Sequence, residues 1–175
     1  ATGWNPWRAS PVKVKSAMRP TTLPPVLILV LLLAACASTR EREFSDNVAE
    51  ANFKLGIGYM QSGHFEVAAE KLLKALQFKD DYPEAHNAIA VLYEEIREYN
   101  PAEIHYKRAI ELKPDYTLAK LNYARFLCTR EPTRVAEGES ELQRIATDPV
   151  NAGATAAEAY VALAVCVRKR DDTAQ

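Results

Sequence analysis

IAVLYEEIREYNPAEIHYKRA, residues 89–109, repeats a pattern that occurs earlier in LGIGYMQSGHFEVAAEKLLKA, residues 55–75. Small residues recur at the same places, as Gly56, Ala68 and Ala75 in the first copy and as Ala90, Ala102 and Ala109 in the second. Larger side chains recur beside them, as Leu55, Tyr59 and Leu72 and then as Ile89, Tyr93 and Tyr106. Two antiparallel helices approach closely only where Gly or Ala replaces a bulky side chain, and larger residues then fill the remaining space. The pattern predicts stacked pairs of helices.

A period of about 34 residues with small residues at these places is that of the tetratricopeptide repeat. A third unit begins at Thr117, and its Tyr123-Ala124 pair lies one further period after Ile89-Ala90. Its second helix matches the repeat pattern if two residues are inserted near Pro132. Pro132 is expected to start that helix or to lie in the turn before it. The insertion brings Gly138, Leu142 and Ile145 to the apolar places, where strict register would put Ser140 and Gln143. A fourth first helix is expected over residues 154–168, with Leu163-Ala164 at the paired site.

The chain is therefore expected to be all-α, a right-handed helical solenoid of about three and a half tetratricopeptide repeats. The expected repeat domain is 47–175, with repeats at about 49–82, 83–116 and 117–152 and a partial fourth at 153–175, which we interpret as truncated. The segments before it are interpreted as an upstream or unstructured extension (1–17), a signal peptide (18–35) and a polar tether (36–46), with Met18 as the expected natural start.

Residues 26–32, VLILVLL, form an apolar run that is too short to span a bilayer, for which a helix needs about 20 residues. A short apolar core that ends in small residues is typical of a secretory signal. The next residues, Leu33-Ala34-Ala35-Cys36, resemble the lipobox of bacterial lipoproteins. The resemblance implies cleavage before Cys36, with diacylglycerol on its sulfur and an acyl group such as palmitate on its amine. The alternative is an ordinary signal peptide with an incidental cysteine. Because Ala37 is not Asp, enterobacterial sorting rules favour the outer membrane, with the domain facing the periplasm.

A second resemblance lies in the third repeat and beyond it. Residues 122–128, NYARFLC, resemble the N-Y-G-x-F-L-C signature of the type IV pilus biogenesis and stability lipoproteins, and residues 159–166, AYVALAVC, are similar to that family's A-x-x-N-x-G-L-C segment. Asp148-Pro149 resembles the D-P link between them. The chain departs from the family pattern at Ala124 and Ala164, where Gly is usual, and at Ala162, where Asn is usual. The resemblance implies a pilotin, which binds secretin subunits and brings them to the outer membrane for assembly, without catalysis.

Stacked helix pairs create a concave groove lined by residues of the first helices. In this register the groove residues are Phe53, Ile57, Met60, Asn87, Val91, Glu94, Leu121, Arg125 and Cys128. The apolar members suit an amphipathic helix or an extended peptide, which Glu94 and Arg125 could orient. The alternative is that some of these residues only pack between repeats. A general periplasmic scaffold that recruits envelope proteins through the same groove remains a second hypothesis, and an enzyme whose catalytic domain lies beyond Gln175 a third.

Cys128 and Cys166 fall on successive first helices, which are expected to lie side by side. A disulfide between them is therefore expected in an oxidising periplasm. The alternative is two buried free thiols, because neighbouring helix axes lie about 8–10 Å apart.

Composition and residue patterns give no support for other classes of function. The formal net charge is −1 and no basic face accumulates, so no nucleic-acid partner is expected. The three histidines, His64, His86 and His105, are not spaced from Cys or carboxylates as zinc ligands are. No Ser/His/Asp or Cys/His set can be argued from their order. We therefore expect no catalytic residues, no metal, no small-molecule substrate and no cofactor other than the covalent lipid on Cys36.

Overall fold

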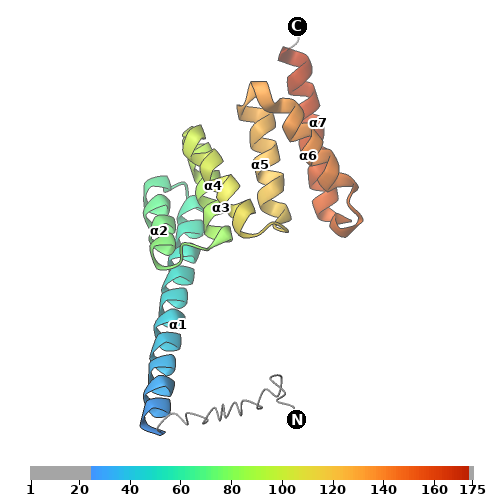
Figure 1. The fold of residues 1–175 in the computed structure, drawn as a ribbon. Helices are drawn as coiled ribbons and strands as arrows, with labels where there is room; N and C mark the ends of the chain where they lie inside the picture. Colours follow the sequence, from blue (N-terminus) through green and yellow to red (C-terminus); the bar gives the residue numbers. More distant parts are fainter. Residues whose placement is uncertain (1–24, 174–175) are drawn as a thin grey trace, which may run out of the picture. The chain divides into compact units, whose positions relative to one another are not determined.

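A computed structural model of the chain describes the backbone of residues 25–173 and the side chains of residues 40–171. Helices account for most of this part: α1 (Pro25–Gln61), α2 (Phe65–Phe78), α3 (Pro83–Glu95), α4 (Tyr99–Leu112), α5 (Thr117–Arg130), η1 (Pro132–Arg134), α6 (Val135–Thr147), η2 (Pro149–Asn151) and α7 (Ala154–Thr173) (Figure 1). No strand occurs between residues 25 and 173. The chain divides into two units, 1–39 and 40–175, and the second contains the repeats. The predictions for residues 1–24 and for the side chain of Cys36 lie outside the described residues.

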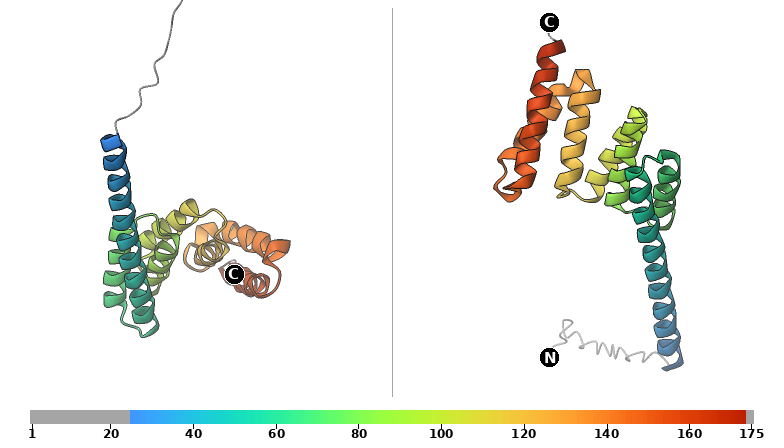
Figure 2. Two further views of the ribbon diagram at one scale, coloured as in Figure 1. Left: turned by 90° about the horizontal axis from the view of Figure 1, so that it is seen from below. Right: turned by 180° about the vertical axis from the view of Figure 1, so that it is seen from behind.

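The second unit is a tetratricopeptide-repeat helical solenoid, as the sequence predicts. The first helices of the repeats are α1, α3, α5 and α7, and the second helices are α2, α4 and α6. Successive pairs follow one another along a curved row, and α7 packs against both helices of the third pair (Figure 2). The core is divided into three clusters, each of which joins neighbouring helix pairs.

Close approach of paired helices depends on the predicted small residues. Ala68, Ala75, Ala102 and Ala109 are all 0% exposed. A Cβ atom added to Gly56 would lie 2.6 Å from Cγ of Leu72, so α1 and α2 touch where Gly56 has no side chain. A Cβ on Gly138 would lie 2.6 Å from the carbonyl oxygen of Ala124 on α5. Neither distance leaves room for a methyl group.

Two of the large residues expected to fill the interior do not do so. Leu72, Ile89 and Tyr106 are buried, but Leu55 is 51% exposed and Tyr59 is 37% exposed. The counterpart of Leu55 in the second repeat, Ile89, packs in one cluster with Leu72 of the preceding second helix. No second helix precedes α1 among the described residues, so Leu55 and Tyr59 have no such neighbour.

The predicted insertion in the third repeat is the short helix η1, which begins at Pro132. Gly138, Leu142 and Ile145 are buried as expected, whereas Ser140 and Gln143 are not. Helix α7, the first helix of the fourth repeat, keeps the repeat register after a further insertion at η2. Ala159 and Cys166 are both buried, as are Ala119 and Phe126 at the same places of α5. Ala164 is exposed because no second helix follows α7 in the described part of the chain.

The turns also repeat. Lys79 lies over the ring of Tyr82 at 5.5 Å, and Lys113 lies over the ring of Tyr116 at 5.1 Å, one period later. After α1, Gly63 has a φ of 75°, and Arg97, at the same place of the next repeat, has a φ of 65°. In the first two repeats the turn between the paired helices therefore contains one residue in the left-handed conformation, which glycine adopts without strain.

Residues 36–46, interpreted as a tether, belong to α1. Ser45 Oγ donates a hydrogen bond to the carbonyl oxygen of Phe78 at 2.5 Å, and Asp46 pairs with Lys79 at 3.2 Å. The start of the second unit is thus tied to the end of α2. Among the described residues, no helix combines the length and apolar character needed to cross a membrane.

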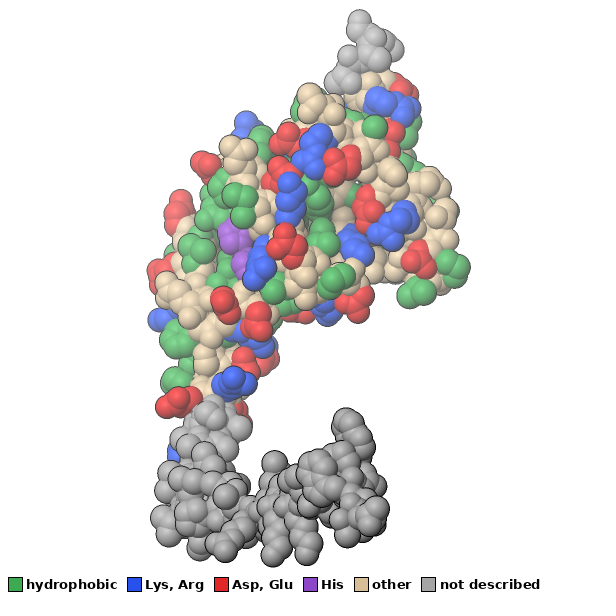
Figure 3. Space-filling model, viewed as in Figure 1, with side chains coloured by type: hydrophobic (Ala, Val, Ile, Leu, Met, Phe, Trp, Pro, Cys, Tyr) green, Lys and Arg blue, Asp and Glu red, His purple; other side chains and the backbone are tan. Residues whose placement is uncertain are grey.

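A cluster of charged groups joins the second and third repeats. Arg134 in η1 donates to Glu103 on α4, to Glu137 on α6 at 2.8 Å and to the hydroxyl of Tyr123 on α5 at 3.0 Å. Partial burial acts to raise the pKa of Glu103, but hydrogen bonds from Lys107, Arg134 and Tyr123 outweigh it and lower that pKa to about 2. The carboxylate of Glu103 is therefore stabilised in its charged form. Elsewhere acidic and basic side chains are intermixed, as one face of the molecule shows (Figure 3).

Candidate partner-binding face

The first helices contact one another directly and form the inner layer of the solenoid. Asn122 on α5 donates a hydrogen bond to Asn87 on α3 at 3.1 Å, and α5 is joined to α7 by a disulfide. The second helices form the outer layer, as in other stacked-repeat proteins, whose concave side is the extended binding surface. The predicted groove residues all belong to the inner layer, on α1, α3 and α5.

The amino-terminal half of this face is apolar. Phe53, Ile57 and Met60 are half-buried and pack against the cluster that contains Leu72 and Ile89. The ring of Phe53 lies 5.1 Å from the ring of Tyr82. These three residues therefore hold the first two repeats together and still leave part of their surface open. Val91 is also half-buried and packs against the cluster of Tyr106 and Phe126.

A chain of hydrogen bonds forms the centre of the face. Asn87 and Asn122 are only 6% and 7% exposed. Arg125 Nη2 donates to Oδ1 of Asn122 at 3.3 Å, and Nδ2 of Asn122 donates to Oδ1 of Asn87. A guanidinium can only donate, so it fixes which way both amides point. Arg125 itself is half-buried.

Glu94, predicted to orient a partner, already has partners within the chain. Its carboxylate accepts hydrogen bonds from the hydroxyl of Tyr106 at 3.0 Å and from Nε of Arg130 at 3.2 Å. Glu94 is 8% exposed. Burial, together with the charge of Glu94 and the hydrogen bond to it, raises the pKa of the Tyr106 phenol. Glu94 therefore joins α3, α4 and α5 rather than presenting a free charge.

Leu121 does not line the groove, which corrects the sequence prediction. It is 1% exposed and lies in the cluster with Leu142, Ile145 and Cys166. The repeat register places Leu121 at the same position as Asn87, but α7 and α6 close over it. Cys128, also predicted at the groove, is 1% exposed as well.

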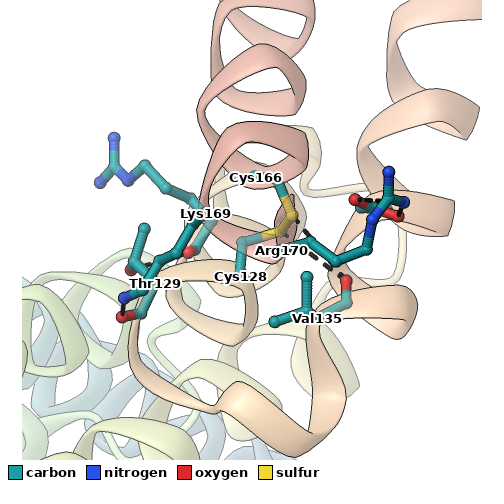
Figure 4. Close-up of a disulfide and its surroundings, with 8 residues drawn as sticks. Cys128, Thr129, Val135, Cys166, Lys169 and Arg170 are labelled. Carbon is teal, nitrogen blue, oxygen red and sulfur yellow. Dashed lines mark hydrogen bonds and ion pairs between the residues drawn. A yellow bond between two sulfur atoms is a disulfide. The ribbon is translucent and has the colours of Figure 1, made fainter. Parts of the chain in front are cut away.

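Cys128 on α5 and Cys166 on α7 are joined by a disulfide, with their Cα atoms 5.1 Å apart (Figure 4). The carbonyl oxygen of Val135 lies 3.9 Å from Sγ of Cys128 and 3.8 Å from Sγ of Cys166. Nearby, Lys169 on α7 donates to the carbonyl oxygen of Thr129, and Arg170 forms an ion pair with Glu139 on α6 at 2.7 Å. The disulfide and these polar contacts fix α7 against the third repeat.

Several exposed apolar residues on the first helices were not among the predicted groove residues, including three on α5 and α7. Leu118 is 46% exposed, Val161 is 67% exposed and Val165 is 38% exposed. Val161 and Val165 occupy the same places of α7 as Leu121 and Arg125 occupy on α5. Extending the groove register into the fourth helix would have identified both.

His86 and His105 form a pair that the sequence spacing did not reveal. Their Nδ1 atoms are 2.9 Å apart, and Nε2 of His86 lies 3.1 Å from the carbonyl oxygen of Asp80. The carbonyl accepts, so His86 carries its proton on Nε2 and accepts at Nδ1 from His105. Burial, and then the neighbouring His86, lower the pKa of His105 to about 4. No group of three or more possible metal ligands occurs among the described residues.

Comparison with known proteins gives structural neighbours. No protein-family model and no curated protein matches the chain. The chain is similar to PilF of Pseudomonas aeruginosa, with 27% identity and a TM-score of 0.63, over 75% of this chain and 57% of PilF. It is also similar in fold to PilW, a widely conserved type IV pilus biogenesis factor, with 24% identity and a TM-score of 0.65, over 71% of this chain and 56% of PilW. The chain thus spans little more than half the length of either protein.

Proposed function

We propose that this chain is a lipid-anchored, non-catalytic tetratricopeptide-repeat protein of type IV pilus biogenesis. Its inner face binds secretin subunits in the periplasm, and the lipid on Cys36 carries the complex to the outer membrane, where the subunits assemble. The similarity to PilF, at 27% identity with a TM-score of 0.63, is the observation that carries the proposal. The lipobox-like residues 33–36 and the signature-like residues 122–128 support it independently.

The geometry supports binding rather than catalysis. Phe53, Ile57 and Met60 offer partly open apolar surface at one end of the inner face, and Val161 and Val165 offer it at the other. An apolar strip interrupted by the half-buried Arg125 suits a segment of another polypeptide. The same surface would serve a general periplasmic scaffold, so the identity of the captured protein is decided by experiment.

The test is deletion of the gene followed by complementation with the wild type or with Cys36→Ser. The outer membrane is then assayed for secretin multimers. We expect multimers to be lost on deletion, restored by the wild type and not restored by Cys36→Ser. Mass spectrometry of the mature wild-type protein should show acyl chains on Cys36. Normal multimers in the deletion strain would refute the pilus role, and capture of a different envelope protein by the Cys36→Ser chain would favour the scaffold.

A further inference from the structure

We propose that Arg125, with Asn87 and Asn122, recognises a carboxylate on an extended segment of the bound protein, between two apolar contacts. The inference rests on the proposed function, because it assumes that the inner face holds a polypeptide. It adds the chemistry of that segment: an acidic side chain with apolar neighbours on both sides.

The first support is the row of residues in which Arg125 lies. Ile57, Val91 and Arg125 occupy equivalent places of three successive first helices. After the insertions at η1 and η2, Val165 follows at the same place of α7. This central row therefore crosses all four first helices and contains one charged residue among three aliphatic ones. A segment that crosses the helices meets apolar surface, then a guanidinium, then apolar surface again.

The second support is that the charge of Arg125 has no acidic partner among the described residues. Among the described residues its guanidinium makes one hydrogen bond, to Oδ1 of Asn122, which leaves most of its five donor hydrogens unused. Five other arginines of the repeats form ion pairs with carboxylates, namely Arg108, Arg130, Arg134, Arg144 and Arg170. Among the described residues Arg97 and Arg168 also lack a carboxylate partner, but both are exposed to solvent, whereas Arg125 is half-buried. The neighbouring carboxylate, Glu94, is held by Tyr106 and Arg130.

The third support is the direction of the hydrogen bonds. Donation runs from Arg125 to Asn122 and from Asn122 to Asn87, and both amides are nearly buried, so their orientation is fixed. Nδ2 of Asn87 makes no hydrogen bond in the described structure. The series Arg125–Asn122–Asn87 therefore has unused N–H donors at both of its ends. A centre that offers a positive charge and spare N–H groups selects an anionic acceptor.

Helix spacing sets the expected sequence of the segment. Neighbouring first helices pack with axes about 8–10 Å apart, and an extended chain advances about 3.3–3.6 Å per residue. About three residues therefore separate the contacts with successive helices. The segment should read apolar, two residues of any kind, Asp or Glu, two residues of any kind, apolar.

The test is selection of a random-peptide phage library on the full-length chain carrying Cys36→Ser, in four forms: otherwise wild type, Arg125→Glu, Arg125→Lys and Arg108→Glu. Arg108 lies on the outer layer with an exposed partner, Glu111, so its reversal is the matched charge control. We expect the unaltered and Arg108→Glu chains to enrich the acidic motif and Arg125→Glu to enrich Lys or Arg at the same place. Arg125→Lys keeps the charge and should still enrich the acidic motif. For one selected peptide, replacing its acidic residue by the amide should weaken binding to the unaltered chain about tenfold or more.

Selected peptides without an acidic residue, or the same motif from Arg125→Glu, would overturn the inference, and so would the absence of any enrichment. A secretin subunit is tested for binding to the same four chains. Secretin bound equally by the unaltered and Arg125→Glu chains overturns the inference and leaves the proposed function standing. An acidic motif without secretin binding supports the inference and counts against the secretin assignment.

Discussion

Removing the disulfide between Cys128 and Cys166 should destabilise the carboxyl-terminal end of the solenoid. The two cysteines are 38 residues apart in sequence, and the bond closes a loop that contains η1, α6 and η2. The loop-closure relation for a loop of this length gives about 4 kcal/mol at 25 °C, from the lower entropy of the unfolded chain. With an m-value of about 2 kcal/mol per M, the urea midpoint should fall by about 2 M.

The assay compares urea unfolding of the full-length Cys36→Ser chain with and without reductant, so that no third thiol takes part. The control is a Cys128→Ala/Cys166→Ala chain, whose midpoint should be low and should not respond to reductant. Hydrogen exchange should locate the effect, because repeat interfaces contribute separately to the stability of a solenoid. Amides of α7 should exchange faster on reduction, and those of α3 should change little. Equal midpoints for the oxidised and reduced chains, or faster exchange mainly in α3, would show that the reasoning is wrong.

Three further predictions concern the packing and the ionisable groups. Gly138→Ala should lower the free energy of unfolding by about 1–3 kcal/mol, because the added methyl group would overlap the carbonyl oxygen of Ala124. Gly58→Ala is the control: a Cβ there meets nothing within 4 Å, so in the same urea titration the free energy of unfolding should rise by about 0.5–1 kcal/mol. Glu103 has a folded pKa of about 2, so its contribution to stability is complete above its ordinary pKa near 4.5 and is lost as the pH falls toward 2. Glu103→Gln should reduce the dependence of the urea midpoint on pH between 4.5 and 2. The same pH dependence in the variant and the wild type would count against the Arg134 cluster as its cause. His105, with a pKa of about 4, should destabilise the fold as the pH falls from 6.5 to 4, because the unfolded chain binds its proton more readily. His105→Phe should remove this dependence, measured as the midpoint at several pH values across that interval, and a slope equal to that of the wild type would contradict the assignment.

Periodicity in the sequence predicts the fold because the small residues of the repeat mark the places where paired helices touch. Ala68 and Ala102 occupy the same place in successive repeats, and both are completely buried. The insertion at Pro132 could also be inferred, since only one register buries Leu142 and keeps Gln143 out of the core. Leu55 was mispredicted because a repeat pattern assumes neighbours on both sides, and the first helix has none on one side in the described part of the chain.

The sequence predicts which helices carry the candidate face, but not how deeply each of its side chains is buried or which of them are already paired. Register identifies which residues point toward the inner layer, and it placed Arg125 there. It does not show that α7 closes over Leu121, because that depends on the length of the η2 insertion. Nor does it show that Glu94 is already paired, because Arg130 lies 36 residues away on another helix and reaches back to it. The His86–His105 contact likewise depends on how α3 and α4 are rotated about their axes.

The left-handed turn at Arg97 has a consequence for the second repeat. A residue with a Cβ in this conformation costs about 1 kcal/mol, which Gly63 avoids at the equivalent turn. The chain therefore contains the same hairpin twice, once relaxed and once strained, within one molecule. Arg97→Gly should therefore raise the free energy of unfolding by up to about 1 kcal/mol, so the link between α3 and α4 is a place where one substitution strengthens the solenoid.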